Sequence, residues 1–185
     1  MIRVTLDEEN LRIAEKFVKS GYKIVNRSMY AAIGRALTTS RKAIKPILNQ
    51  KYTVKQGGIN HVVNLKKERT DSFLKGTLEV TGKMIPLSYF NFKVPRKRSG
   101  MVRVSVKKRN SPKPVKGLFA NRTRRGKRIS LRRKQKTRYP LSVAYGPSVP
   151  KMVESEEVLR PIVSVAEKTL NERFLHEISW RLSKK

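Results

Sequence analysis

The distribution of charge along the chain constrains its fold more than any other feature. Between Glu79 and Glu154 there is no acidic residue, and this stretch holds 22 of the 44 Lys and Arg in the 185-residue sequence. All thirteen acids lie at these two positions or outside them. Like charges at this density repel one another and destabilise a compact state. We therefore expect a basic middle block between two ends of mixed charge, with a thin hydrophobic core.

The net charge of +31 calls for an acidic partner. Duplex DNA carries about one negative charge per 1.7 Å of its axis, which makes nucleic acid the first candidate. An acidic protein surface is the second. An anionic membrane fits less well, because the sequence has no long apolar run and no strongly apolar helix face rimmed by Lys.

Few aromatic residues accompany the cations of the basic block. Phe119 and Tyr139 flank its densest stretch without interrupting it. Single strands are usually bound by aromatic side chains that stack on bases, so this pattern favours sequence-independent attraction to backbone charge. The candidate contacts with nucleic acid or an acidic partner are the clustered cations of the block: Arg96, Lys97, Arg98, Lys107, Lys108, Arg109, Arg122, Arg124, Arg125, Lys127, Arg128, Arg132, Arg133 and Lys134.

Hydrophobic periodicity predicts an α+β fold, with N- and C-terminal helices packed on a small, mostly antiparallel sheet and a long basic loop. Residues 1–27 are expected to form an N-terminal arm with a short helix that stops at Ser20-Gly21. Residues 28–185 are expected to form one domain. Its expected parts are a helix over 28–48, a short helical piece near 59–66, a strand region over 73–106, a basic loop over 107–138 and a helix over 161–183.

Prolines and spacing set the expected ends of the two long helices. Pro46 should kink or end the first helix near Ala43–Lys45, because proline lacks an N–H and clashes with the preceding turn. Pro161 suits the first residue of the last helix. An apolar stripe at helical spacing marks the face of the last helix that should pack: Ile162, Val165, Ala166, Leu170, Phe174, Ile178 and Leu182.

Catalytic and metal-binding signatures are thin. The chain has no cysteine, which excludes disulfides and thiolate sites. His61 and His176 stand far apart, and neither the G-x-S-x-G elbow nor a phosphate-binding P-loop occurs. Carboxylates that could hold catalytic cations are missing from the whole middle of the chain. We therefore expect no enzymatic activity, no cofactor and no small-molecule substrate.

Two passages carry a specific order of residues that composition alone does not explain, Gly82–Phe90 and Tyr139–Met152. Their prolines fix φ, so both should be rigid and extended, with a turn at Tyr145–Pro147 that places Ser148 to cap the next segment. Either fold-defining turns or direct partner contact would explain them. The residues that carry the pattern are Gly82, Ile85, Pro86, Leu87, Phe90, Tyr145, Gly146, Pro147, Ser148 and Pro150.

These passages resemble the G-[RK]-x-I-P-L-x-x-F and P-[LI]-x-x-x-[YF]-G-P-S-V-P-x-M passages of the phage lambda-type minor tail protein Z family, the tail completion proteins. The order of parts agrees over roughly residues 28–182. The resemblance implies a structural virion protein at the neck, where the tail meets the head. It would form a ring of six or twelve copies around the DNA path.

The partners implied by that resemblance are further copies of the chain, the tail terminator, tail tube or head–tail connector proteins, and double-stranded DNA. The N-terminus, Met1–Asn10, carries acids and no apolar signal region, so synthesis in the host cytoplasm is expected. The main alternative is a ribosomal or other RNA-binding protein, which would share the basic character and thin core. A nuclease or toxin would need a carboxylate cluster that the sequence does not suggest.

Overall fold

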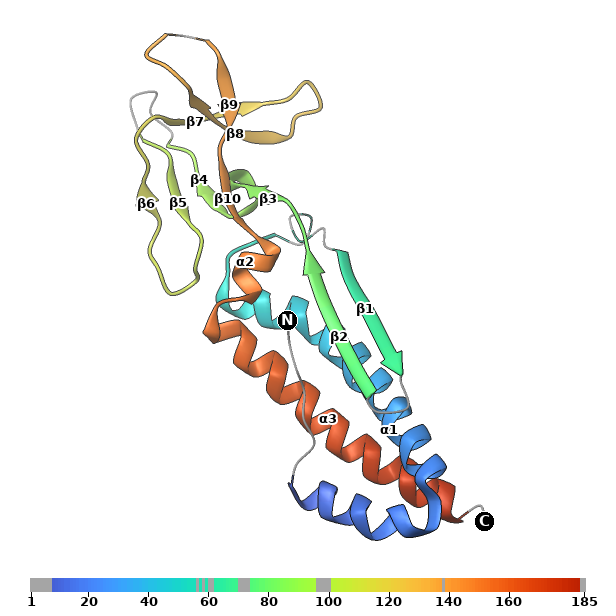
Figure 1. The fold of residues 1–185 in the computed structure, drawn as a ribbon. Helices are drawn as coiled ribbons and strands as arrows, with labels where there is room; N and C mark the ends of the chain where they lie inside the picture. The colour runs from blue at the N-terminus through green and yellow to red at the C-terminus, as the bar shows by residue number, and fades with distance from the viewer. Residues whose placement is uncertain are drawn as a thin grey trace. The chain divides into compact units, whose positions relative to one another are not determined.

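The computed structural model describes residues 8–55, 57, 59, 62–69, 74–95, 101–137 and 139–183, and the side chains of these residues except 8–20 and 62. Helices at the two ends of the chain and small antiparallel sheets between them make an α+β protein, which confirms the predicted fold class (Figure 1). Residues 8–20 of the N-terminal arm expected over residues 1–27 are described only as backbone, and residues 1–7 and 96–100 lie outside the described residues.

The chain divides into two compact units. Unit 1 comprises the described parts of Met1–Lys45, Val63–Val80 and Glu156–Lys185, and unit 2 those of Pro46–Val62 and Thr81–Ser155. The single domain expected over residues 28–185 spans parts of both units and stays a prediction. Two separate apolar clusters, one among helices and one among strands, account for the division because each unit buries its own core.

Two helices and one hairpin build unit 1. These elements are α1 (Glu8–Lys51, whose last turns belong to unit 2), β1 (Val62–Arg69), β2 (Leu74–Thr81) and α3 (Glu156–Ser183). The expected short helical piece near 59–66 is wrong, because residues 62–69 are the first strand of the hairpin.

The core of unit 1 lies between α1 and α3. Small residues of α1, Ala32 and Ala36, allow the close approach of Leu170 and Phe174 from α3, and Phe174 is fully buried. The apolar stripe predicted for the last helix thus faces α1, with Leu182 packed at its edge. Helix α3 nevertheless begins at Glu156, five residues before the expected start at Pro161. The proline therefore lies inside the helix.

Helix α1 also differs from expectation at its interruption and its end. Its backbone departs from helical geometry at Gly21, where a break was predicted. Pro46, however, does not end it, and the helix continues to Lys51. Ile44 and Leu48 flank the proline and are buried, so apolar burial on both sides of Pro46 offsets the lost backbone hydrogen bond.

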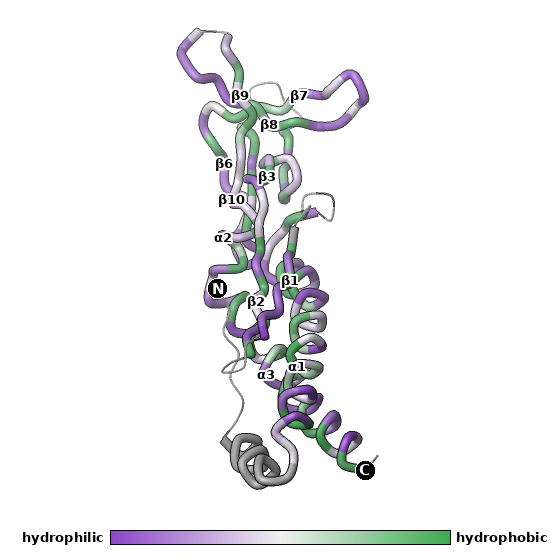
Figure 2. The backbone as a smooth tube through the Cα atoms, turned by 45° about the vertical axis from the view of Figure 1, so that its right-hand side comes forward, coloured by the Kyte–Doolittle hydropathy of each residue, from purple (hydrophilic) through white to green (hydrophobic). Residues whose placement is uncertain are grey.

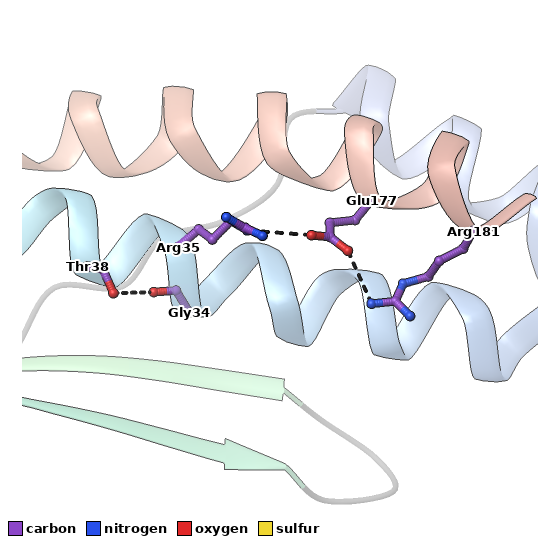
Figure 3. Close-up of polar contacts among 5 residues, drawn as sticks. All are labelled: Gly34, Arg35, Thr38, Glu177 and Arg181. Atoms are coloured by element: carbon purple, nitrogen blue, oxygen red, sulfur yellow. Dashed lines mark hydrogen bonds and ion pairs between the residues drawn. The ribbon is translucent and has the colours of Figure 1, made fainter. Parts of the chain in front are cut away.

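The β1–β2 hairpin packs on a different face of α1 from α3. A Cβ added to Gly76 would lie 2.5 Å from Cγ2 of Ile33 and 3.1 Å from Cδ1 of Leu37, so only glycine allows this approach. Lys67 Nζ lies 4.6 Å from the centroid of the Tyr30 ring. Figure 3 shows α1 between the hairpin and α3.

An ion pair joins the two helices beside this core (Figure 3). The Glu177 carboxylate on α3 lies 3.5 Å from Nε of Arg35 on α1 and 3.1 Å from a terminal nitrogen of Arg181, one turn further along α3. The Glu177 side chain is only 10% exposed. Two cations therefore compensate one buried carboxylate, as burial of a charge requires.

Short strands make up most of unit 2: β3 (Met84–Pro86), β4 (Asn91–Lys93), β5 (Arg103–Ser105), β6 (Lys113–Pro114), β7 (Leu118–Arg122), β8 (Arg128–Arg133), β9 (Leu141–Val143) and β10 (Tyr145–Ser148). The 3₁₀-helix η2 (Leu87–Tyr89) and the helix α2 (Val149–Val153) complete it. The strands form the antiparallel sheets β4-β5-β6, β7-β8-β9 and β10-β3.

The expected basic loop over 107–138 is wrong, because this segment contains β6, β7 and β8. Its few apolar residues fall where they can be buried. Leu118 packs with Val102 and Val104 of the neighbouring sheet, and Leu131 is also buried. A strand needs burial at only some of its positions, so the remaining positions can all be cationic without preventing strand formation.

Candidate nucleic-acid interface

Positive charge is concentrated in unit 2. This unit holds 24 of the 44 Lys and Arg, and Glu154 is its single acid. Unit 1 holds the other twelve acids with 20 cations. One carboxylate cannot neutralise 24 cations, so the surface of unit 2 is intensely positive whatever local pairs it forms.

The β7–β8 hairpin places several of the predicted contacts together. Its strands are in register from Leu118 opposite Arg132 to Arg122 opposite Arg128. In the turn, the Thr123 N–H donates to the Lys127 carbonyl at 2.9 Å, and the Gly126 N–H donates to the Thr123 carbonyl at 2.8 Å. Gly126 has φ +73°, a conformation that glycine adopts without strain.

The tip of this hairpin is consequently cationic on both strands. Arg124 and Arg125 occupy the turn and are exposed, and Figure 2 shows hydrophilic residues at this turn and along the β8–β9 connection. Arg122 and Arg128 lie directly opposite each other. Like charges in that arrangement destabilise a hairpin, so an anion bound between or beside them would stabilise it.

Two shallow hollows meet at Arg128. One has a volume of about 330 Å³ and is lined by Lys55, Ser88, Tyr89, Lys127 and Arg128. The other, of about 350 Å³, is lined by Val94, Ala120, Asn121, Arg122 and Arg128. Neither is lined by an acidic residue. Both hollows therefore offer cations, amide or hydroxyl groups and small apolar surfaces to a ligand.

Contacts between several segments fix the residues that line the first hollow. The Lys127 ammonium donates a hydrogen bond to the Tyr89 hydroxyl, and its Nζ lies 4.6 Å from the ring centroid. The Lys55 N–H donates to the Tyr89 carbonyl at 2.7 Å, and the Ser88 N–H donates to Ser130 Oγ at 3.3 Å. Ser130 is itself fully buried, so η2 is fixed against β8.

The remaining predicted cations lie elsewhere in unit 2. Arg132, Arg133 and Lys134 follow Arg128 along β8 and into its connection to β9, all exposed. Lys107, Lys108 and Arg109 lie in the connection between β5 and β6 and line neither hollow. Arg96, Lys97 and Arg98 are outside the described residues. Among the described members of the predicted set, Arg122, Lys127 and Arg128 are the ones that line the two hollows.

Three residues of the first hollow were not predicted. Lys55 lies outside the acid-free block, and Ser88 and Tyr89 belong to the first of the two Pro/Gly passages. Their nearness to the β7–β8 turn depends on non-local pairing, which no local pattern reveals. The one signal available was a tyrosine within a stretch predicted to be rigid.

The two Pro/Gly passages pair with each other. Strand β3 of the first passage pairs antiparallel with β10 of the second, with Tyr145 opposite Pro86 and Ser148 opposite Met84. The expected turn at Tyr145–Pro147 is therefore wrong, because these residues form a strand. Ser148 does cap α2 as predicted, since its side chain accepts a hydrogen bond from the Lys151 N–H.

Close packing explains several residues of these passages. A Cβ on Gly146 would lie 2.8 Å from the ring of Phe90 and 3.1 Å from Leu87, so the second passage rests on the first. Ile85 and Phe90 are buried, whereas Met84 and Tyr145 are exposed. A Cβ added to Gly82 would lie 3.5 Å from Cδ of Pro150, an ordinary contact distance. The passages thus define the fold of unit 2, and Met84 and Tyr145 are left for contacts outside it.

Within the described part of the chain, no three His, Asp or Glu residues are grouped so that they could hold a metal ion. None of the described helices combines the length and apolar character needed to cross a bilayer. Comparisons with protein-family models, curated proteins and solved structures give no match to this chain.

Proposed function

We propose that this chain is a non-enzymatic structural protein that binds the phosphate backbone of duplex DNA through unit 2. The observation that carries the proposal is the segregation of charge: one compact unit holds 24 cations and a single acid. Its hairpins present these cations on exposed strands and turns. Such a surface attracts phosphates without reading base sequence.

We place this protein at the head-proximal end of a phage tail, where a ring would surround the DNA path. The support is the resemblance of Gly82–Phe90 and Tyr139–Met152 to tail completion proteins. The two passages pair with each other in one ladder, so partner contacts made by either passage would come from a single surface. Exposed Met84 and Tyr145 on that ladder are candidate contacts with a neighbouring copy or a tail protein.

Electrophoretic mobility shifts with duplexes of unrelated sequence test the DNA-binding part. Affinity should be the same for each duplex and should fall steeply with salt, by a log–log slope of about −0.9 for each phosphate neutralised. Absence of binding at low salt, or binding that does not change with salt, would overturn the proposal. Electron microscopy of tails purified from infected cells, with the protein labelled, tests its place in the particle.

An RNA-binding protein of the ribosomal type is the second candidate. The projecting basic hairpins β7–β8 and β8–β9 favour it, since basic extensions suit crowded RNA surfaces. Fractionation of cell extracts discriminates the two functions, because the RNA-binding protein would travel with ribosomes and the tail protein with particles or tails. A preference for folded RNA over duplex DNA at equal salt would also favour the second candidate.

A further inference from the structure

The hollow beside η2 is distinguished by a cation, Lys127, whose side chain is held by a neighbouring residue. Lys127 is bound to the Tyr89 hydroxyl, and Arg128 begins β8 directly opposite Arg122 of β7. Elsewhere on unit 2, long side chains such as Arg124, Arg125 and Lys134 are exposed on turns. Cations that are already positioned lose less entropy when they bind a ligand.

The chemistry of the lining suits an oxyanion. Lys127, Arg128 and Lys55 supply positive charge, and the guanidinium of Arg128 can donate two parallel hydrogen bonds to a phosphate. The Tyr89 hydroxyl accepts from Lys127, so its own proton can be donated to an oxygen of the ligand. The volume of about 330 Å³ lies at the small end of ligand sites.

We propose that this hollow is a discrete seat for one phosphodiester group of a nucleic-acid backbone. Arg128 and Lys127 contact the phosphate, Tyr89 positions Lys127, and Lys55 adds charge from outside the acid-free block. The proposal rests on the proposed DNA binding and specifies where unit 2 binds the phosphate backbone of the nucleic acid. Arg122, opposite Arg128 in the second hollow, is placed to contact the backbone beside the seat.

Charge-matched variants on one strand test the seat. Arg128→Gln and Arg133→Gln each remove one exposed cation from β8, but alternation along the strand places the two side chains on opposite faces of the sheet. Arg128→Gln should lower affinity for a duplex about tenfold, whereas Arg133→Gln should lower it about twofold. Equal losses would overturn the seat while leaving sequence-independent DNA binding intact. Failure of the unchanged protein to bind any duplex would overturn both proposals.

Tyr89→Phe provides a second variant that changes no charge. It removes the hydroxyl that holds Lys127 and should lower duplex affinity about threefold to tenfold, with the salt slope nearly unchanged. Unchanged affinity in Tyr89→Phe would show that positioning of Lys127 does not matter. Circular dichroism should show that each variant is folded, and Lys127→Gln replaces Arg128→Gln if the latter is not.

Inorganic phosphate distinguishes a backbone seat from a site for the free ion. At matched ionic strength, phosphate should displace the duplex no better than chloride does, because a backbone contact gains from many neighbouring cations. Displacement by phosphate at far lower ionic strength than by chloride would mark the hollow as a free-phosphate site. If a poly-glutamate peptide displaces the duplex and phosphate does not, the hollow binds an acidic protein partner instead. That result and displacement by free phosphate would each overturn the proposal.

Discussion

At the scale of single residues, two acids of α3 show how burial decides what a carboxylate contributes to stability. Glu177 lies between Arg35 and Arg181 and is almost completely buried, while Glu172, one turn earlier on α3, pairs with Lys168 in solvent. The two carboxylates are alike in sequence and differ in surroundings. Burial makes the first pair sensitive to loss of a partner, and exposure makes the second nearly neutral.

Replacement of Glu177 by Gln should therefore lower the free energy of unfolding by about 1–3 kcal/mol, because Arg181 loses its buried partner. The loss of about 3–5 kcal/mol that is typical of a fully buried pair is not expected, since the Arg35 side chain is 58% exposed and water screens its charge. Glu172→Gln is the matched control and should change stability by less than about 0.5 kcal/mol. Urea unfolding followed by circular dichroism measures both, and similar effects would contradict the burial argument.

At the scale of elements, a helix or strand could be predicted where its own apolar residues repeat at a regular spacing. An element whose burial depends on residues far away in the sequence could not. The apolar stripe of α3 identified its buried face, and the strand region predicted over 73–106 contains β2, β4 and β5. Strands β7 and β8 were missed because their arginines, Arg122, Arg128, Arg132 and Arg133, and the basic turn between the strands obscure the alternation of the few apolar residues. The contacts that bury Leu118 come from another sheet, which local periodicity cannot show.

The residues of the candidate site were likewise predictable only where a local feature of the sequence marked them. Its cations were predicted from charge alone, so Arg122, Lys127 and Arg128 were identified together with many residues that line no hollow. Lys55 and Tyr89 could not be, because their positions depend on backbone hydrogen bonds between segments far apart in sequence. Charge composition thus predicts the class of partner, and only the paired strands specify where it would be held.

Phe174 tests the packing of α3 on α1. Truncation to Ala removes a fully buried ring from the core of unit 1 and should cost about 3–5 kcal/mol of stability. Leu175, the next residue, is 38% exposed, and Leu175→Ala should cost less than about 1 kcal/mol. A thermal melt of each variant gives the comparison. An unchanged melting temperature for Phe174→Ala would mean that this face of α3 does not pack on α1.

At the scale of the whole molecule, the uneven distribution of charge along the sequence matches the division into two units. Unit 1 mixes both signs and forms ion pairs on α3 and between β1 and β2 residues, such as Lys66 with Glu79. Unit 2 has almost no carboxylate with which to do so. Its core, built on short strands, must hold against the repulsion among its own cations. The two units should therefore respond differently to the surrounding solution.

Salt should stabilise unit 2 more than unit 1. Raising KCl from about 50 mM to about 500 mM shortens the screening length several-fold and weakens repulsion between exposed cations. Hydrogen exchange read by mass spectrometry should show protection rising in β7, β8 and β5, with little change in the middle of α3. A duplex added at low salt should produce the same gain. Equal changes in both units would mean that repulsion does not limit the stability of unit 2.

The path of the chain through the two units also sets an order of synthesis. Unit 2 is enclosed in the sequence by unit 1, whose last segment is α3. A ribosome adds roughly 5–20 residues each second and domains tend to fold as they emerge. All strands of unit 2 precede Ser155, so the basic unit can fold while α1 still waits for the helix that buries Ala32 and Ala36. The basic unit can thus be complete before α3 is made and before the helical core of unit 1 can form.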